Sequence, residues 1–143
     1  MSREQEIKQI RIDKIAKLQK IGMNAYVDPG SIKRDIKLKE ANKNFEILEK
    51  EEKTKTVVGR IMAKRGTNKI IFSKIFDGTD DFQVVFKKDI LGDEKIKIYE
   101  KLFDIGDFAE FEGTFFKTKT GQGSMLVKNF RILTKSLLPL PEK

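Results

Sequence analysis

Residues 64–87 combine side chains that suit the recognition of unpaired bases. Side chains alternate between two faces along an extended strand, so Phe72 and Lys74 share one face of the run 70–76. The other face carries three residues that suit a protein interior: Ile71, Ser73 and Ile75. Because an interior excludes an unpaired lysine, we expect the face with Lys74 to be solvated and Phe72 to be an exposed aromatic.

The following run, 82–87, brings an amide close to that ring. Gln83 alternates with three apolar residues, Phe82, Val84 and Phe86, so we expect it to point outward. A base stacks on an exposed aromatic ring for about 1–3 kcal/mol, and an amide reads the edge of the base by hydrogen bonding. A different role for Phe72 is that of a core residue beneath a helix, either the one expected over 93–103 or one near the N-terminus.

Two basic loops flank these runs. The loop 64–69 contains Arg65 and joins the first two expected strands, and the loop 117–123 contains Gly121 and Gly123, which let a backbone bend sharply and approach a ligand. Six cations of these strands and loops are candidate phosphate contacts: Arg60, Lys64, Lys69, Lys74, Lys117 and Lys119. Lysine-rich hairpin tips also occur on proteins that bind nothing.

The composition excludes most familiar catalytic chemistry. The chain has no cysteine and no histidine, so thiolate nucleophiles, cysteine zinc sites and Ser-His pairs are ruled out. We therefore expect no catalytic residue and no metal site. A net charge of +8 favours polyanionic partners such as RNA or DNA. No apolar run approaches the ~20 residues of a membrane-spanning helix, and the N-terminus lacks a signal-peptide core, so we expect a cytoplasmic protein without membrane contact.

Helical spacing dominates the first third of the chain. From about Arg3 to Ile21, apolar residues recur every three to five positions and approximate one stripe of a helix. Cations lie between them, and Arg11 and Lys14 are two further candidate phosphate contacts, with an ordinary solvated face as the alternative. A second helical stretch is marked by four apolar residues: Leu38, Ala41, Phe45 and Leu48.

The period then changes from helical to alternating. We expect strands near 56–64, 69–77, 82–87, 108–117 and 124–133, with the helix over 93–103 between the third and the fourth. The order βββαββ is that of the OB-fold, a mainly β, five-stranded Greek-key barrel, with another small barrel or an α+β sheet as the alternative. The chain then divides into an N-terminal helical appendage (1–53), the barrel (54–136) and a linker (137–143).

Longer motifs extend through the chain. They comprise Arg11, Lys14, Leu18, Gly22 and Tyr26, then Val58 to Arg65, Lys69 with Phe72, Phe82-Gln83, Gly106-Asp107, Gly113 to Gly121 and Leu133 to Lys143. Together they resemble the N-terminal anticodon-binding domain of bacterial class II lysyl-tRNA synthetases over essentially the whole chain. The resemblance implies that Phe72 stacks the middle anticodon base, Gln83 hydrogen-bonds a uracil edge, and Arg65 holds the base or its phosphate.

The resemblance also implies a homodimeric parent enzyme that uses ATP and magnesium to attach lysine to a tRNA with a U-rich anticodon, and it allows a monomeric fragment without cofactors. In the family, the run Leu133 to Lys143 leads into the catalytic domain, whose ATP- and lysine-binding motifs are absent here. Gln122, the fourth candidate base contact, stands where the family usually has glutamate, and Gly123 stands where leucine is usual. A carboxylate accepts from N3–H of uracil and repels N3 of cytosine, whereas an amide can present either end. We therefore expect weaker discrimination of uracil from cytosine at Gln122.

Three other interpretations fit the same residues. The chain could be the anticodon domain of an aspartyl- or asparaginyl-tRNA synthetase, which shares the barrel and the Phe and Gln pair. It could be a free-standing, sequence-tolerant binder of single strands, or a barrel that binds only proteins. The run Leu133 to Lys143 favours the lysyl enzyme.

Overall fold

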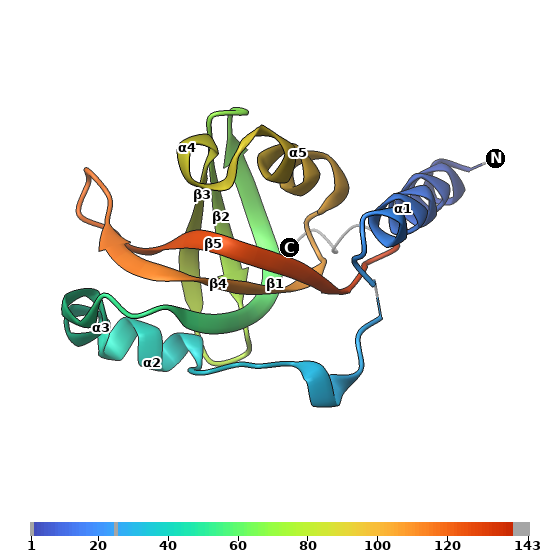
Figure 1. Ribbon diagram of the computed structural model, residues 1–143. Helices are drawn as coiled ribbons and strands as arrows, with labels where there is room; N and C mark the ends of the chain where they lie inside the picture. Colours follow the sequence, from blue (N-terminus) through green and yellow to red (C-terminus); the bar gives the residue numbers. More distant parts are fainter. Residues whose placement is uncertain (1, 25, 139–143) are drawn as a thin grey trace.

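The computed structural model describes residues 2–24 and 26–138 and is built around a five-stranded barrel (Figure 1). The strands are β1 (Lys55–Gly66), β2 (Ile70–Phe76), β3 (Asp81–Lys87), β4 (Phe108–Lys117) and β5 (Gly123–Thr134). They close in the order β1-β2-β3-β5-β4, with antiparallel pairs except where β3 runs parallel to β5. This topology confirms the predicted OB-type barrel. Residues 139–143 of the predicted linker lie outside the described residues.

Helices lie around three sides of the barrel (Figure 1). They are α1 (Arg3–Lys20), the short 3-10 turn η1 (Pro29–Ser31), α2 (Leu38–Lys43), α3 (Phe45–Glu51), α4 (Lys88–Leu91) and α5 (Asp93–Leu102). The helical stretch expected through Leu48 is two helices, because the chain breaks at Asn44 between α2 and α3. The single turn α4 was not expected. The helix expected over 93–103 is confirmed as α5.

The apolar stripe expected in α1 is only partly buried. Leu18 is fully buried, but Ile10 is 55% exposed and Ile21 is 43% exposed. The helix still begins on a capping box, in which Ser2 accepts from the backbone N–H of Gln5 and the Gln5 side chain accepts from the backbone N–H of Ser2. Local capping and one anchoring leucine therefore place α1 beside the barrel.

The barrel core is aromatic beneath α5. The rings of Phe86 and Tyr99 stack with centroids 3.7 Å apart, and Phe111 and Phe130 meet this pair edge-on. The Tyr99 hydroxyl lies 2.7 Å from the hydroxyl of Ser73, which gives the one polar residue of the inner β2 face a partner. Burial raises the pKa of Tyr99, so this hydroxyl remains protonated.

A buried ionic cluster closes the end of the barrel opposite α3. The Lys135 ammonium is fully buried between Asp104, at 2.6 Å, and Asp107. Asp107 also accepts hydrogen bonds from the backbone N–H groups of Asp104 and Ser136, both at 2.8 Å. This Asp104–Asp107–Lys135 cluster ties the chain after β5 to the turn before β4.

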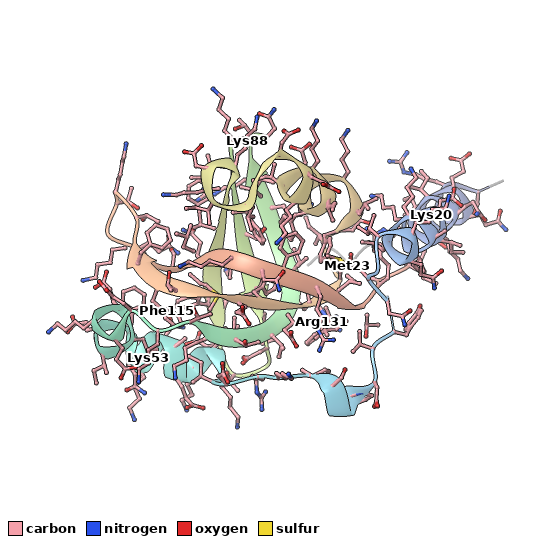
Figure 2. The ribbon with its side chains drawn as sticks, in the orientation of Figure 1. Lys20, Met23, Lys53, Lys88, Phe115 and Arg131 are labelled. Carbon is pink, nitrogen blue, oxygen red and sulfur yellow. The ribbon has the colours of Figure 1, made fainter. Side chains whose placement is uncertain are left out.

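The connector between α1 and α2 runs along the outside of the barrel. Arg131 of β5 reaches it (Figure 2) and donates to the carbonyl oxygen of Ser31 at 2.7 Å while its guanidinium pairs with Glu110 at 3.1 Å. Farther along, the Asp35 carboxylate accepts from the backbone N–H of Thr56 at 2.8 Å. These bonds fix the path that brings α2 and α3 to the far end of the barrel.

Candidate nucleic-acid interface

A groove of about 840 Å³ lies between three parts of the chain. One wall is formed by β1, β2 and β3, a second by the turn between β4 and β5, and the third by residues 42–47 of α2 and α3. The groove contains all four candidate base contacts: Arg65, Phe72, Gln83 and Gln122. The fold therefore brings together residues that are far apart in the sequence.

Phe72 lies on the groove and is not a core residue. Its side chain is half-buried, whereas its neighbours Ile71 and Ser73 are buried on the other face of β2. Arg65 pairs with Phe72 across β1 and β2, and its guanidinium carbon lies 5.5 Å from the centroid of the Phe72 ring. A cation over an aromatic ring is attracted to it, so this contact restrains both side chains at the edge of the groove.

Gln83 lines the groove but is not exposed as expected from strand alternation. Only 9% of the residue is accessible, because β5 runs beside β3 and Ser124 is the register partner of Gln83. The Gln83 amide nitrogen donates to the Ser124 hydroxyl at 3.0 Å, and that hydroxyl donates to the carbonyl oxygen of Gln122 at 3.2 Å. The closing strand pair therefore shields Gln83 and restrains its amide.

Comparison with known proteins places this barrel in a family. A model of the OB-fold nucleic acid binding domain of the tRNA anticodon type matches residues 55–133. The chain belongs to this family. The match covers β1 to β5 almost completely, so the groove lies within the family domain except for the wall from α2 and α3.

Similar full-length proteins also agree with the resemblance expected from the motifs. A lysine–tRNA ligase of Clostridium botulinum is 43% identical over 138 residues, which are 96% of this chain and 27% of that protein. The lysine–tRNA ligases of Carboxydothermus hydrogenoformans and Clostridium tetani are each 41% identical over 96% and 100% of this chain. The chain spans 27–28% of the length of these relatives.

Within the OB-fold domain, the cations divide into two groups. Lys74 and Lys117 line the groove, and Lys74 pairs with Asp81 at 3.3 Å on the surface. Three others are exposed outside the groove: Lys69 and Lys119 at the hairpin tips, and Arg60 with its guanidinium 5.7 Å from the ring centroid of Phe108. Two of these candidate cations thus lie in the groove, and three are exposed outside it.

Lys64 is not available for phosphate, which corrects the expectation from sequence. A register shift in β1 between Ile61 and Ala63 turns Lys64 toward α5 and leaves Arg65 on the groove. The Lys64 ammonium donates to the carbonyl oxygens of Tyr99, at 2.9 Å, Glu100, at 3.1 Å, and Phe103, at 2.5 Å. Burial lowers the pKa of Lys64 to about 8, and the cation satisfies the last carbonyls of α5.

Arg11 and Lys14 lie away from the groove as well. Lys14 pairs with Asp104 at 2.7 Å, and Arg11 donates to the carbonyl oxygens of Ser136 and Leu138, both at 3.1 Å. Although burial opposes ionisation of Asp104, the bonds from Lys135 and Lys14 outweigh it and hold the Asp104 pKa below its usual range. In this structure Arg11 therefore holds the chain after β5 and Lys14 holds the turn before β4, which corrects the expectation that they are free to contact phosphate.

The wall from α2 and α3 was missed by the sequence reasoning. The Phe45 ring of α3 packs edge-on against Phe115 of β4, with centroids 6.1 Å apart, on the side of the barrel that faces these helices (Figure 2). It leaves polar side chains of Asn42, Asn44 and Glu46 along the groove. The only signal was the pair of asparagines inside a helical pattern, since asparagine favours helix ends.

No group of three or more Asp or Glu side chains suited to a metal ion occurs among residues 2–24 and 26–138. Within the same ranges, no helix is long and apolar enough to cross a membrane.

Proposed function

We propose that this chain is the tRNA anticodon recognition module of a lysine–tRNA ligase. The observation that carries the proposal is the convergence of Arg65, Phe72, Gln83 and Gln122 on one groove of an OB-type barrel. The lysine–tRNA ligases that share 41–43% identity with this chain support the lysyl assignment.

The groove would hold splayed-out bases of a U-rich anticodon. Phe72 would offer the stacking surface, and Arg65, whose guanidinium carbon lies 5.5 Å from the ring centroid, would contact the base or its phosphate. Gln83 and Gln122 would hydrogen-bond base edges from β3 and from the β4–β5 turn. Stacking supplies sequence-tolerant affinity, so the preference for one anticodon would come from the two amides.

Phosphates would be held by the cations that remain free of the core. Lys74 and Lys117 in the groove, with Lys69, Lys119 and Arg60 around it, are placed for this role. Each phosphate neutralised releases counterions, so the affinity would fall steeply with salt concentration.

The ligase activity would come from another part of the parent protein. In this proposal residues 1–53 are a helical appendage, 54–136 the barrel, and 137–143 a linker toward a catalytic domain. ATP and magnesium would act in that domain of a homodimeric enzyme.

The test is the affinity for anticodon stem-loops that differ only in the anticodon, measured by gel shift at several salt concentrations. We expect a preference for UUU over loops read by aspartyl and asparaginyl enzymes. Phe72→Ala should weaken binding by about 5- to 150-fold, the equivalent of about 1–3 kcal/mol of stacking. Phe76→Ala is the matched control, because Phe76 is 43% exposed on the same strand outside the groove. Equal binding of all loops, or of poly-U and poly-A, would contradict the proposal.

A further inference from the structure

The groove contains a hydrogen-bond chain whose direction is fixed. Gln83 donates its amide N–H to the hydroxyl of Ser124, and Ser124 donates its single proton to the carbonyl oxygen of Gln122. Ser124 is fully buried and Gln83 is 9% accessible, so bulk water does not compete freely for these bonds. A hydroxyl that has already donated its proton can only accept from its other neighbour.

This chain determines which end of the Gln83 amide a ligand meets. With the amide nitrogen bonded to Ser124, the carbonyl oxygen is the atom left for the groove, and no buried side-chain oxygen or nitrogen lacks a partner among the described residues. The Gln83 oxygen is therefore accessible. A carbonyl oxygen accepts from N3–H of uracil, but it opposes the lone pair on N3 of cytosine.

We infer that Ser124 is a positioning residue that makes Gln83 selective for uracil over cytosine. The inference rests on the proposed anticodon-binding function, and it concerns a residue that touches Gln83 and not the base. If the Gln83 amide turned round to suit cytosine, its oxygen would face the Ser124 hydroxyl. That hydroxyl has one proton and could donate it either to Gln83 or to Gln122, so one hydrogen bond would be lost.

Gln122 provides the contrast within the same groove. Its backbone is held by Thr118, which donates to its carbonyl oxygen at 3.0 Å and accepts from its N–H at 3.2 Å. Its side-chain amide is exposed and makes no hydrogen bond to the described part of the chain. One groove amide therefore has a fixed direction, and the other is free to turn.

One hydrogen bond corresponds to about a 2- to 13-fold change in a binding constant. Ser124→Ala should therefore reduce the ratio of uracil to cytosine affinity by about 2- to 13-fold at the one base that Gln83 reaches. The ratios of uracil to cytosine affinity at the other two anticodon bases should stay unchanged, because Phe72, Arg65 and Gln122 remain in place.

The experiment uses the 143-residue chain and four stem-loops, with anticodon UUU and with each uracil changed singly to cytosine. The matched control is Ser73→Ala, which removes another buried hydroxyl, one on the inner face of β2 that bonds to Tyr99 and not to Gln83. The inference would be overturned if Ser124→Ala kept the uracil-to-cytosine affinity ratio of the unmodified chain. It would also be overturned if this ratio fell equally at all three bases, or fell as much in Ser73→Ala. If the unmodified chain binds the four loops equally, the anticodon proposal itself fails.

Discussion

Replacing Lys135 with methionine tests how firmly the Asp104–Asp107–Lys135 cluster holds the end of the barrel. Both Lys135 and Asp107 have fully buried side chains. An exposed ion pair contributes about 0–1 kcal/mol, but removal of one partner from a buried pair leaves an uncompensated charge and costs about 3–5 kcal/mol. We therefore expect Lys135→Met to lower the free energy of unfolding by about 3–5 kcal/mol.

Urea denaturation followed by circular dichroism measures this change. Lys128→Met is the matched control, because Lys128 is an exposed lysine of β5, and it should alter the free energy of unfolding by less than about 0.5 kcal/mol. The double variant Lys135→Met with Asp107→Asn should recover much of the loss, since it removes the orphaned charge.

The pH dependence provides a second test of the same cluster. Burial already raises the pKa of Asp107 above its ordinary value of 3.8, and loss of Lys135 raises it further. Above that ordinary value the unfolded chain releases the proton that the folded variant retains, so the penalty is present at neutral pH and shrinks as the pH falls toward about 4. A loss under about 1 kcal/mol, or one that is constant between about pH 7 and pH 4.5, would refute the reasoning.

Three further changes probe other parts of the molecule. Gln122→Glu should sharpen the choice of uracil over cytosine at the base it touches, because a carboxylate only accepts; equal discrimination in stem-loop titrations would count against this role. Lys64→Met tests the buried ammonium: between pH 8 and 10.5 the unfolded chain holds a proton that the folded chain has released. In urea titrations, the free energy of unfolding of the unmodified chain should therefore rise relative to that of the variant by up to about 1.4 kcal/mol per pH unit over this range. A difference that does not change with pH would contradict the lowered pKa of Lys64. Gly123→Leu should lower the free energy of unfolding by about 1–3 kcal/mol in thermal unfolding, since even a Cβ there would lie 2.9 Å from a ring carbon of Phe45. In a background that already carries Phe45→Ala the same change should cost less, and an undiminished cost would point to the backbone instead.

The alternation of side chains along β2 was enough to predict the groove face. Phe72 and Lys74 lie outside and Ile71, Ser73 and Ile75 inside, because that strand is regular and one face is buried. The same rule gave the wrong exposure for Gln83, since a period of two does not reveal that β5 covers β3. The pairing of β3 with β5 joins Gln83 to Ser124, which lie 41 positions apart in the sequence, and local sequence carries no signal for it.

The exposure of the cations could not be predicted from the sequence either. A single register shift in β1 sends Lys64 and Arg65 to opposite sides, although they are neighbours in a basic loop motif. The cations of α1 follow the helical period as expected, but Asp104 and the carbonyl oxygens of Ser136 and Leu138 bind them. The net charge of a sequence predicts the sign of the electrostatic field around the protein. Strand bulges and buried carboxylates determine which cations remain free to contact a ligand.

The two groove amides show why residue type alone does not determine base preference. A carboxylate has one hydrogen-bonding character in every orientation, so a glutamate would be selective wherever it reached a base. An amide has two, and its selectivity must come from a neighbour that fixes its direction. Gln83 has such a neighbour in Ser124, whereas the Gln122 side chain has none in the described part of the chain. Selectivity for uracil in this groove would thus reside in the β3–β5 pair, where strand closure places a serine beside a glutamine.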